Sequence, residues 1–584
     1  MGYCPEHIGS LWAKVSVPSG ANLASCAFLM LTMSTLTAGP IHVLTSRYND
    51  SRTGANISET ALNVSNVNSA TFGAVFSLAV SGSVYAQPLY VPGVTIPGKG
   101  VHNVLYVCTM NDIIYAFDAD SNTGGNKSPL WKLNLTNPPQ VVAPTWKQIT
   151  GSAIGNVTGT VGIMSTPVIN FSKGVMFVVA RTLESGKFVY RLHSINFASG
   201  IDLNSVEINA TIPGTGVTSV GGVITFDPKQ EMQRPGLAVT NNGLVVIAWS
   251  SQQDMDPYHG WVMAYREDNL QQAGVFCTTP DGSRGGIWQA GRAPAVDVAG
   301  NVYFLVGNSD ATMEDPNFGV DFGEAALKFS TTGQQLRLTD WFEPDNGPAL
   351  DSTDTDVGSS GLTLIPNTDL MVGGGKQGVF YLLDSSNLGH EQTGNGQIPQ
   401  VLSVSPGLRT KGGPVYWQSS TLGPLIYTWN ESSYLEAYHF NGATFDTAPV
   451  LTGVAQAGTT GAILTLSAHN ENPNTGIIWA SLPLSGSPGN AVVPGIIRAL
   501  NAETLEEIWN SQEVPSRDSV GTYAKFVPPL VVNGKVHMAT FNNAVVVYGL
   551  LPVDARALPK RKRAAGKEIR TLSVTRNSGK SNEN

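Results

Sequence analysis

The chain has 584 residues, of which 42% are hydrophobic and only 13% are charged, and its formal net charge is −9. This length exceeds that of one ordinary domain, and the 63 glycines and 35 prolines favour many short strands joined by turns over long helices. The net negative charge argues against a general nucleic-acid surface, which needs clustered Lys and Arg to displace counterions, so no nucleic-acid partner is expected.

The two ends of the chain differ in composition from the rest. Residues 23–36 are mostly apolar, follow Lys14 and precede Thr37-Ala38-Gly39, as a secretory segment and its cleavage site do. Because this apolar run is too short to span a bilayer, we expect residues 1–39 to be an export leader and the chain to have no transmembrane span. The protein is then secreted, periplasmic or at the cell surface. The C-terminal segment, residues 553–584, carries the basic run 560–563 and is expected to be a disordered tail.

The spacing of the cysteines bears on two kinds of prosthetic group. The four cysteines are far apart and form neither a CxxC pair nor a CxxCH haem-attachment motif; they are Cys4, Cys26, Cys108 and Cys277. We therefore expect no zinc and no c-type haem.

One pattern recurs along the chain: a Pro or Gly start, an apolar strand, a turn, further apolar strands, and then an Asp or Asn. The repeats begin about 60 residues apart, which is wide for a four-stranded blade, so long loops must decorate one face. This repeat predicts an all-β protein, an eight-bladed β-propeller, with seven blades as the alternative. The eight starts are Pro88, Pro167, Pro235, Pro294, Gly361, Pro414, Ala462 and Pro529.

The last repeat is incomplete, because it supplies strands only over residues 530–532, 536–540 and 545–548. An orphan strand, Ala74 to Val80, precedes the first repeat. Since a propeller must not leave an open strand edge, we expect this orphan strand to complete the last blade. The propeller then spans residues 69–552, and the extended segment 40–68 lies outside it, as the two terminal segments do.

The segment Ala499–Trp509 reads A-L-N-A-E-T-L-E-E-I-W. It is similar to the A-x-D-x-x-T-G-x-x-x-W docking motif of the pyrroloquinoline quinone (PQQ) dehydrogenases, with Asn for Asp and Leu for Gly. The first repeat carries a stretched version that ends at Trp131. The chain thus resembles a divergent member of the quinoprotein dehydrogenase superfamily, and the resemblance implies that these Trp side chains pack between blades.

Four further segments resemble the cofactor-contacting parts of the same family, in the same order along the chain. The run G-G-I-W that ends at Trp288 is similar to the strand whose Trp stacks under the quinone, and V-G-N, ending at Asn308, to the segment whose Asn holds calcium. The run D-T-D stands where the family has D-x-W-D, which implies that its last residue, Asp356, is the catalytic base and a metal ligand. The run K-Q-G-V-F-Y-L-L-D, which starts at Lys376, resembles the segment whose Lys hydrogen-bonds a quinone carbonyl.

The resemblance implies PQQ and calcium as cofactors and an alcohol or sugar as substrate. Oxidation of an alcohol by PQQ needs a base for the hydroxyl proton and a cation that polarises the quinone carbonyl. Asp356, Asn308 and Lys376 are residue types that suit these roles.

The sequence departs from the family at the metal. Where the family has a calcium-binding Glu, this chain has the stretch 253–260, in which only Asp256 or Asp254 can replace it. The Trp of D-x-W-D is Thr355, and the adjacent cysteine pair that covers the quinone is absent. Structural roles stay open as alternatives: Trp288 as interblade core, and the site's Asn, Lys and Asp side chains as turn residues or a solvated acidic loop.

Basic residues precede the innermost strands of four repeats and are expected to approach the central funnel; they are Arg234, Arg292, Lys411 and Lys525. They predict a positive focus for a carboxylated small ligand, with Arg292 as a cofactor contact, and salt bridges to loop Asp residues are the alternative. Two functions stay open. One is a PQQ-dependent dehydrogenase, and the other is a non-catalytic propeller or binding scaffold that takes a glycan, an anionic small molecule or a protein through its funnel and loops.

Overall fold

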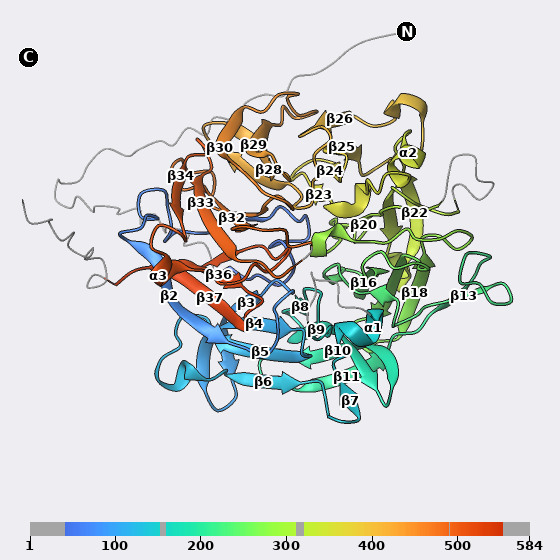
Figure 1. Cartoon of the computed structure of the whole chain (residues 1–584), viewed down its shortest axis with the longest axis horizontal. Coiled ribbons are helices and arrows are strands. Elements are labelled where there is room, and N and C mark those ends of the chain that lie inside the picture. Colours follow the sequence, from blue (N-terminus) through green and yellow to red (C-terminus); the bar gives the residue numbers. More distant parts are fainter. Residues whose placement is uncertain (1–40, 152–158, 311–319, 490, 553–584) are drawn as a thin grey trace, which may run out of the picture. The chain divides into compact units, whose positions relative to one another are not determined.

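The computed structural model describes residues 41–151, 159–310, 320–489 and 491–552. Eight mainly antiparallel sheets follow one another in chain order around an axis (Figure 1). The strands are short and largely buried on both faces, because each sheet packs between two neighbours. The predicted all-β, eight-bladed propeller is confirmed, and the seven-bladed alternative is wrong.

The first four blades are given from the innermost to the outermost strand. Blade one contains β3 (Leu89–Ile96), β4 (Gly100–Thr109), β5 (Ile113–Asp118) and β6 (Trp131–Asn134). Blade two contains β8 (Val168–Asn170), β9 (Val175–Glu184), β10 (Lys187–Asn196) and β11 (Asp202–Glu207), and β7 (Val141–Val142) also pairs with β9. Blade three contains β15 (Ala238–Val239), β16 (Leu244–Ser251), β17 (Trp261–Arg266) and β18 (Gln272–Cys277), and β14 (Glu231–Met232) also pairs with β16. Blade four contains β19 (Ala295–Val296), β20 (Val302–Leu305), β21 (Ala326–Ser330) and β22 (Arg337–Phe342).

The next three blades have the same order. Blade five contains β23 (Thr363–Leu364), β24 (Leu370–Gly374), β25 (Val379–Asp384) and β26 (Gln400–Ser403). Blade six contains β27 (Val415–Ser419), β28 (Gly423–Trp429), β29 (Tyr434–His439) and β30 (Leu451–Gln456). Blade seven contains β31 (Ile463–Ser467), β32 (Ile477–Pro483), β33 (Gly495–Asn501) and β34 (Glu507–Asn510).

Short elements decorate the connections between these strands. The helices are α1 (Trp146–Thr150), α2 (Gly347–Asp351) and α3 (Pro515–Asp518). Single 3₁₀ turns are η1 (Gly124–Lys127), η2 (Gln289–Gly291), η3 (Thr332–Gln334), η4 (Val357–Ser359) and η5 (Thr393–Asn395). A hairpin of β12 (Thr211–Pro213) and β13 (Val223–Thr225) projects from the ring in Figure 1.

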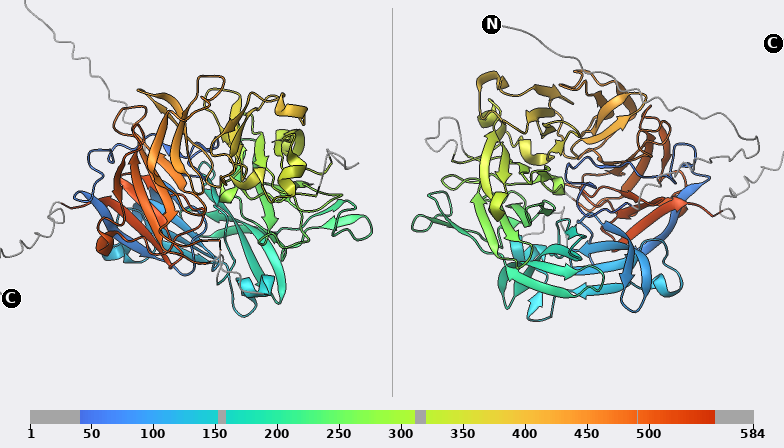
Figure 2. Two further views of the ribbon diagram at one scale, coloured as in Figure 1. Left: turned by 45° about the horizontal axis from the view of Figure 1, so that its top comes forward. Right: turned by 180° about the vertical axis from the view of Figure 1, so that it is seen from behind.

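The eighth blade joins the two ends of the described chain. Its strands β35 (Leu530–Val532), β36 (Lys535–Ala539) and β37 (Ala544–Leu550) come from the C-terminal side, and its outermost strand is β2 (Phe72–Ala79). Strand β2 runs antiparallel to β37, and both views of Figure 2 show the two strands side by side. The predicted closure of the last blade by an N-terminal strand is confirmed.

Tryptophan side chains pack between neighbouring blades. Trp509 of blade seven is fully buried, and its ring lies 4.9 Å from that of Phe72 in blade eight, edge to face. In blade one, the Trp131 indole N–H donates a hydrogen bond of 3.1 Å to the carbonyl of Phe197 in blade two. These contacts agree with the interblade role that the docking motif implies.

Residues 41–58, here called the axial segment, do not lie outside the propeller, so the expectation for residues 40–68 is wrong over this stretch. The inner strands of the blades present unpaired backbone groups toward the axis, and the axial segment pairs with them. Its β1 (Ala55–Asn56) runs parallel to β31 of blade seven, and Tyr48 bonds to Val531 of β35. Further backbone bonds join Val43 to Tyr90, Leu44 to Ile169, Asp50 to Val296, Ser51 to Leu364, and Thr53 to Tyr416.

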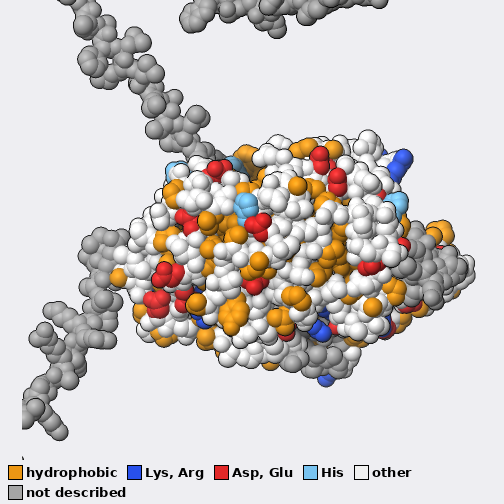
Figure 3. Space-filling view, turned by 90° about the horizontal axis from the view of Figure 1, so that it is seen from above, with side chains coloured by type: hydrophobic (Ala, Val, Ile, Leu, Met, Phe, Trp, Pro, Cys, Tyr) orange, Lys and Arg blue, Asp and Glu red, His pale blue; other side chains and the backbone are white. Residues whose placement is uncertain are grey.

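The remaining expectations about the ends of the chain lie outside the described residues, namely the leader 1–39 and the tail 553–584. Within the described part of the chain, no helix is long and apolar enough to cross a membrane. Of the cysteines, Cys108 and Cys277 are buried free thiols. Figure 3 shows carboxylates singly and in small groups over one face, among apolar and uncharged polar side chains.

Candidate functional site

A cavity of about 400 Å³ lies at one face of the propeller. Its lining comes from segments that precede the inner strands of several blades and from loops between second and third strands. In an antiparallel blade, the start of the first strand and the end of the second lie at the same face, so these segments converge. The volume is in the range of sites for small molecules and cofactors. The lining residues are Met232, Arg234, Gln253, Asp254, Trp288, Ala290, Asp354, Asp356, Ser359, Lys376, Arg409, Lys411, Lys525 and Phe526.

Three of the predicted site residues, Trp288, Asp356 and Lys376, meet in this cavity. Asp356 directly precedes η4 of blade five, and Lys376 lies in the turn between β24 and β25. The Lys376 ammonium is 2.7 Å from Oδ1 of Asp354 and also pairs with Oδ2 of Asp356. Burial lowers the pKa of Lys376, but the charges and hydrogen bonds of the two carboxylates outweigh it and raise that pKa above its usual range.

Asn308, which follows β20, lies behind the Asp356 carboxylate. Its backbone N–H donates a hydrogen bond of 3.0 Å to Asp356 Oδ1, and its side-chain amide lies 3.4 Å from Asp354 Oδ1. The Asn308 side-chain oxygen is buried and has no hydrogen-bond partner among the described residues. Asn308 thus lies beside the acidic loop that carries Asp354 and Asp356.

Two glycines let the backbone approach this group closely. A Cβ on Gly307 would lie 2.5 Å from Asp356 Oδ1 and 3.1 Å from Cδ1 of Trp288. A Cβ on Gly286 would lie 2.9 Å from Nε1 of Trp288. A larger residue in place of these glycines of the G-G-I-W and V-G-N runs would therefore clash with side chains of the site.

Asp256, the expected third metal ligand, does not join the group. Its carboxylate forms two hydrogen bonds with Arg284, of 3.0 and 2.7 Å, and half of its side chain is exposed. Asp254, the other residue that the sequence offered, lines the cavity instead. Burial, and secondarily the charge of Asp356, raises the pKa of Asp254 to about 6.

These residues do not fit a calcium site. The described part of the chain contains no group of three or more His, Cys, Asp and Glu side chains arranged to hold a metal ion. The cation between Asp354 and Asp356 is the ammonium of Lys376. Calcium prefers several anionic oxygens that are free to turn toward it, and here two carboxylates already face a lysine.

Four further residues in the lining of the cavity are basic, namely Arg234, Arg409, Lys411 and Lys525. Burial, and then the charges of Arg234 and Lys411, lowers the pKa of Lys525 to about 7. Arg234 is held by aromatic faces, 5.5 Å from the ring of Tyr85 and 5.1 Å from that of Phe526. Lys411 pairs with Glu431 at 2.9 Å.

Sequence reasoning found three of these four basic residues and missed Arg409. The available signal was position, because Arg409 and Lys411 precede the sixth inner strand as Lys525 precedes the eighth. Arg292 is the opposite case: it was expected at the cofactor and lies apart from this cavity. Its guanidinium donates to Thr363 Oγ1 at 2.6 Å and to surrounding backbone carbonyls.

Comparison by sequence finds no matching family model and no matching curated protein. Solved structures do match. The quinohemoprotein alcohol dehydrogenase ADHIIG of Pseudomonas putida HK5 is 15% identical, with a TM-score of 0.55, over 91% of this chain and 82% of that one. The quinohemoprotein alcohol dehydrogenase of Comamonas testosteroni is 12% identical, with a TM-score of 0.51, over 87% of this chain and 80% of that one. A europium-containing methanol dehydrogenase is 13% identical, with a TM-score of 0.55, over 88% of this chain and 99% of that one.

These likenesses define the class of fold. The chain is an eight-bladed propeller of the quinoprotein dehydrogenase type, as the docking and site motifs implied. At 12 to 15% identity, the likeness shows the fold and leaves the chemistry to the site residues.

Proposed function

We propose that the protein binds PQQ in the 400 Å³ cavity and oxidises an alcohol or a sugar there. The observation that carries this proposal is the lining of the cavity, which combines Trp288 and the Asp356–Lys376 pair with four basic residues. When bound, PQQ supplies a two-electron acceptor for the hydride of the substrate carbon.

The cavity suits a planar quinone that carries carboxylates. Trp288 offers an aromatic face, and Arg234, Arg409, Lys411 and Lys525 offer positive charge to the carboxylates. The neighbouring folds add support, because two are named quinohemoprotein alcohol dehydrogenases and the third a methanol dehydrogenase.

Asp356 is the base in this proposal, since it is the more buried of the two carboxylates that Asn308 and Lys376 both contact. It accepts the substrate hydroxyl proton on the oxygen that now faces Lys376. Lys376 keeps a positive charge beside the base and hydrogen-bonds its carboxylate. No step is assigned to calcium, because the residues do not fit it.

A second candidate is non-catalytic binding of an anionic small molecule in the same cavity. The Lys376 ammonium bonds to both Asp354 and Asp356, and this favours non-catalytic binding, since the Asp356 oxygen that would accept a substrate proton is already engaged by the ammonium. Binding of a glycan or protein through the loops is the broader form of this candidate. The exported location that residues 1–39 suggest stays a prediction, and the N-terminal sequence of the protein recovered from outside the cytoplasm tests it.

The experiment is a titration of the purified chain with PQQ, followed by absorbance of the bound quinone, with dye-linked assays over a panel of alcohols and aldoses. Wild type, Asp356→Asn and Trp288→Leu are compared. Bound PQQ with turnover that Asp356→Asn abolishes supports the dehydrogenase. Bound PQQ without turnover on any substrate supports the second candidate, and failure of the wild type to bind PQQ overturns both the cofactor and the activity.

A further inference from the structure

The axial segment brings two arginines into the interior of the ring, beside Arg292. Arg47, Arg52 and Arg292 are 3%, 0% and 4% exposed. A buried charge is costly unless an opposite charge or a full set of hydrogen bonds accompanies it. The groups that surround these guanidinium groups therefore indicate which kind of ligand the interior of the ring can bind.

Arg52 and Arg292 are met mainly by neutral groups. Arg52 donates to Thr45 Oγ1 and to the carbonyls of Ser46, Asn49 and Pro294. The Arg52–Asp50 pair is long, at 3.8 Å, and more than half of the Asp50 side chain is exposed. The positive charges thus stay largely uncompensated within the described residues. Burial, and then the charges of Arg47 and Arg52, lowers the pKa of Arg292 well below its usual range.

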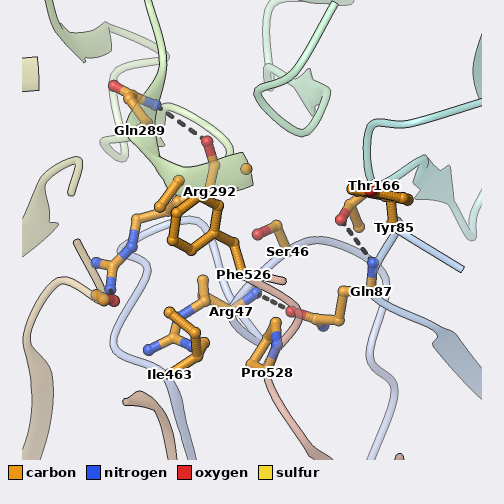
Figure 4. A pocket seen from close by; sticks show the side chains of 13 residues that line it. Ser46, Arg47, Tyr85, Gln87, Thr166, Gln289, Arg292, Ile463, Phe526 and Pro528 are labelled. Atoms are coloured by element: carbon orange, nitrogen blue, oxygen red, sulfur yellow. Dashed lines mark hydrogen bonds between the residues drawn. The ribbon is translucent and has the colours of Figure 1, made fainter. Parts of the chain in front are cut away.

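Several buried donors in this region have no acceptor among the described residues. They are Nε and Nη2 of Arg47, Nη2 of Arg52, and the side-chain N–H₂ of Gln87. Gln87 is oriented with its oxygen toward the backbone N–H of Arg47, at 3.0 Å (Figure 4). Its side-chain N–H₂ therefore has no acceptor in the described part of the chain. The unpaired groups of this region are thus hydrogen-bond donors, and most of them belong to positively charged guanidinium groups.

A small cavity of about 20 Å³ adjoins these groups, and it shares Ala290 and Phe526 with the lining of the large one. Arg47, Gln87 and Arg292 line it, together with Ser46, Thr166 and Gln289 (Figure 4). Two neutral acceptors in the lining are already used: Thr166 Oγ1 accepts from the Gln87 backbone N–H, and Gln289 Oε1 accepts from that of Leu305. The volume suits about one particle of the size of a water molecule.

We propose that this cavity is a binding site for a small monovalent inorganic anion of the halide class. An anion accepts several hydrogen bonds and donates none, which matches a lining of unpaired donors, whereas a water molecule must also donate. The buried arginines supply the charge that makes an anion preferable to a neutral particle. Burial lowers the pKa of Arg47 only to about 10, so this residue remains charged at neutral pH. The anion then fastens the axial segment to the inner strands, independently of any cofactor in the large cavity.

Bromide is the probe, because its anomalous scattering locates it in a crystal of the full chain soaked in a bromide salt. The expected result is an anomalous peak beside the guanidinium of Arg47. In solution, thermal unfolding is compared in sodium chloride and in sodium gluconate of the same ionic strength, since gluconate is too large for the cavity. The unfolding temperature should rise by about 1 °C for each tenfold increase in chloride above the dissociation constant, and should not respond to gluconate.

Arg47→Met removes the unpaired donors, and Arg337→Met, at an exposed side chain of β22, is the matched control. Arg47→Met should lose the chloride dependence of the unfolding temperature, while the control keeps it. If Arg47→Met does not fold, the wild-type bromide soak and salt series decide alone. A wild-type crystal with water and no bromide in this cavity overturns the proposal, and so does equal unfolding in chloride and gluconate.

Discussion

The backbone N–H of Asn308 donates a hydrogen bond of 3.0 Å to Oδ1 of Asp356, 48 residues further along the chain. This bond joins blade four to blade five at the wall of the large cavity. It leaves Oδ2 of Asp356 facing Lys376. The orientation of the proposed base is therefore fixed by backbone on one side and by an ammonium on the other.

Gly307→Ala should disturb this arrangement without unfolding the protein. The added methyl group would lie 2.5 Å from Asp356 Oδ1, so the carboxylate must move. We expect PQQ-dependent turnover to fall at least about tenfold, which corresponds to about 1.4 kcal/mol of transition-state stabilisation. Steady-state kinetics measure this loss. Gly396→Ala is the control, because its Cβ would meet no atom within 4 Å; an equal loss in both variants contradicts the steric argument.

Binding of PQQ should weaken as the pH rises from 6 to 8. Lys525, with a pKa of about 7, loses its charge in this range, and Asp254, with a pKa of about 6, gains one. Both changes make the cavity less attractive to carboxylates. The loss of the Lys525 charge alone predicts a drop of about tenfold in affinity over these two pH units. Titrations at each pH measure it.

Lys525→Gln isolates the contribution of this lysine to the pH dependence. The variant should bind PQQ at pH 6 about as weakly as the wild type does at pH 8. The remaining loss of affinity between pH 6 and 8 in the variant is the contribution of Asp254. Lys99→Gln, at an exposed turn between β3 and β4, should leave the wild-type pH profile unchanged. A Lys525→Gln profile identical to that of the wild type would remove Lys525 from the explanation.

The fold could be predicted from the sequence because its signals are local and repeated. Each blade start that the pattern indicates lies at or just before an observed inner strand, from β3 to β35. Closure by β2 followed from one physical requirement, the absence of an open edge. The site motifs placed Trp288, Asp356 and Lys376 together because each motif lies in a segment that precedes or follows a strand at the same face.

The positions of Arg292 and of the axial segment could not be predicted in this way. Arg292 follows η2, where Gln289 and Ala290 have φ of 45° and 46°, a conformation that neither residue type signals in a sequence. The axial segment has no strand pattern of its own, because its partners are the inner strands of other blades. Its structure depends on contacts between residues hundreds of positions apart, such as Tyr48 and Val531.

Tyr48→Phe should test how firmly the axial segment is held. The Tyr48 hydroxyl accepts a hydrogen bond of 2.7 Å from the Val531 N–H and donates one of 3.1 Å to the Val531 carbonyl. Its removal leaves the buried Val531 N–H unpaired, while the Val531 carbonyl keeps the bond from the Asn56 amide, so we expect the free energy of unfolding to fall by about 1–3 kcal/mol. Chemical denaturation measures the change. Tyr434→Phe, at a side chain that is 43% exposed, should change it by less than about 0.5 kcal/mol; equal effects would show that the hydroxyl bonds of Tyr48 do not hold the segment.

Removal of divalent cations should leave PQQ binding largely intact. The carboxylate of the proposed base, Asp356, and that of Asp354 both face Lys376. Asp256 is paired with Arg284 outside the cavity. A chelator for calcium should therefore change the PQQ dissociation constant less than about twofold, and Asp256→Asn should behave like the wild type. Lys376→Met should instead weaken binding, because it leaves Asp354 and Asp356 as uncompensated negative charges beside the ligand. If calcium restores PQQ binding to Lys376→Met, the ammonium of Lys376 occupies a position that a metal ion can take. If the chelator abolishes PQQ binding by the wild type, the conclusion that Lys376 is the cation at this position is wrong.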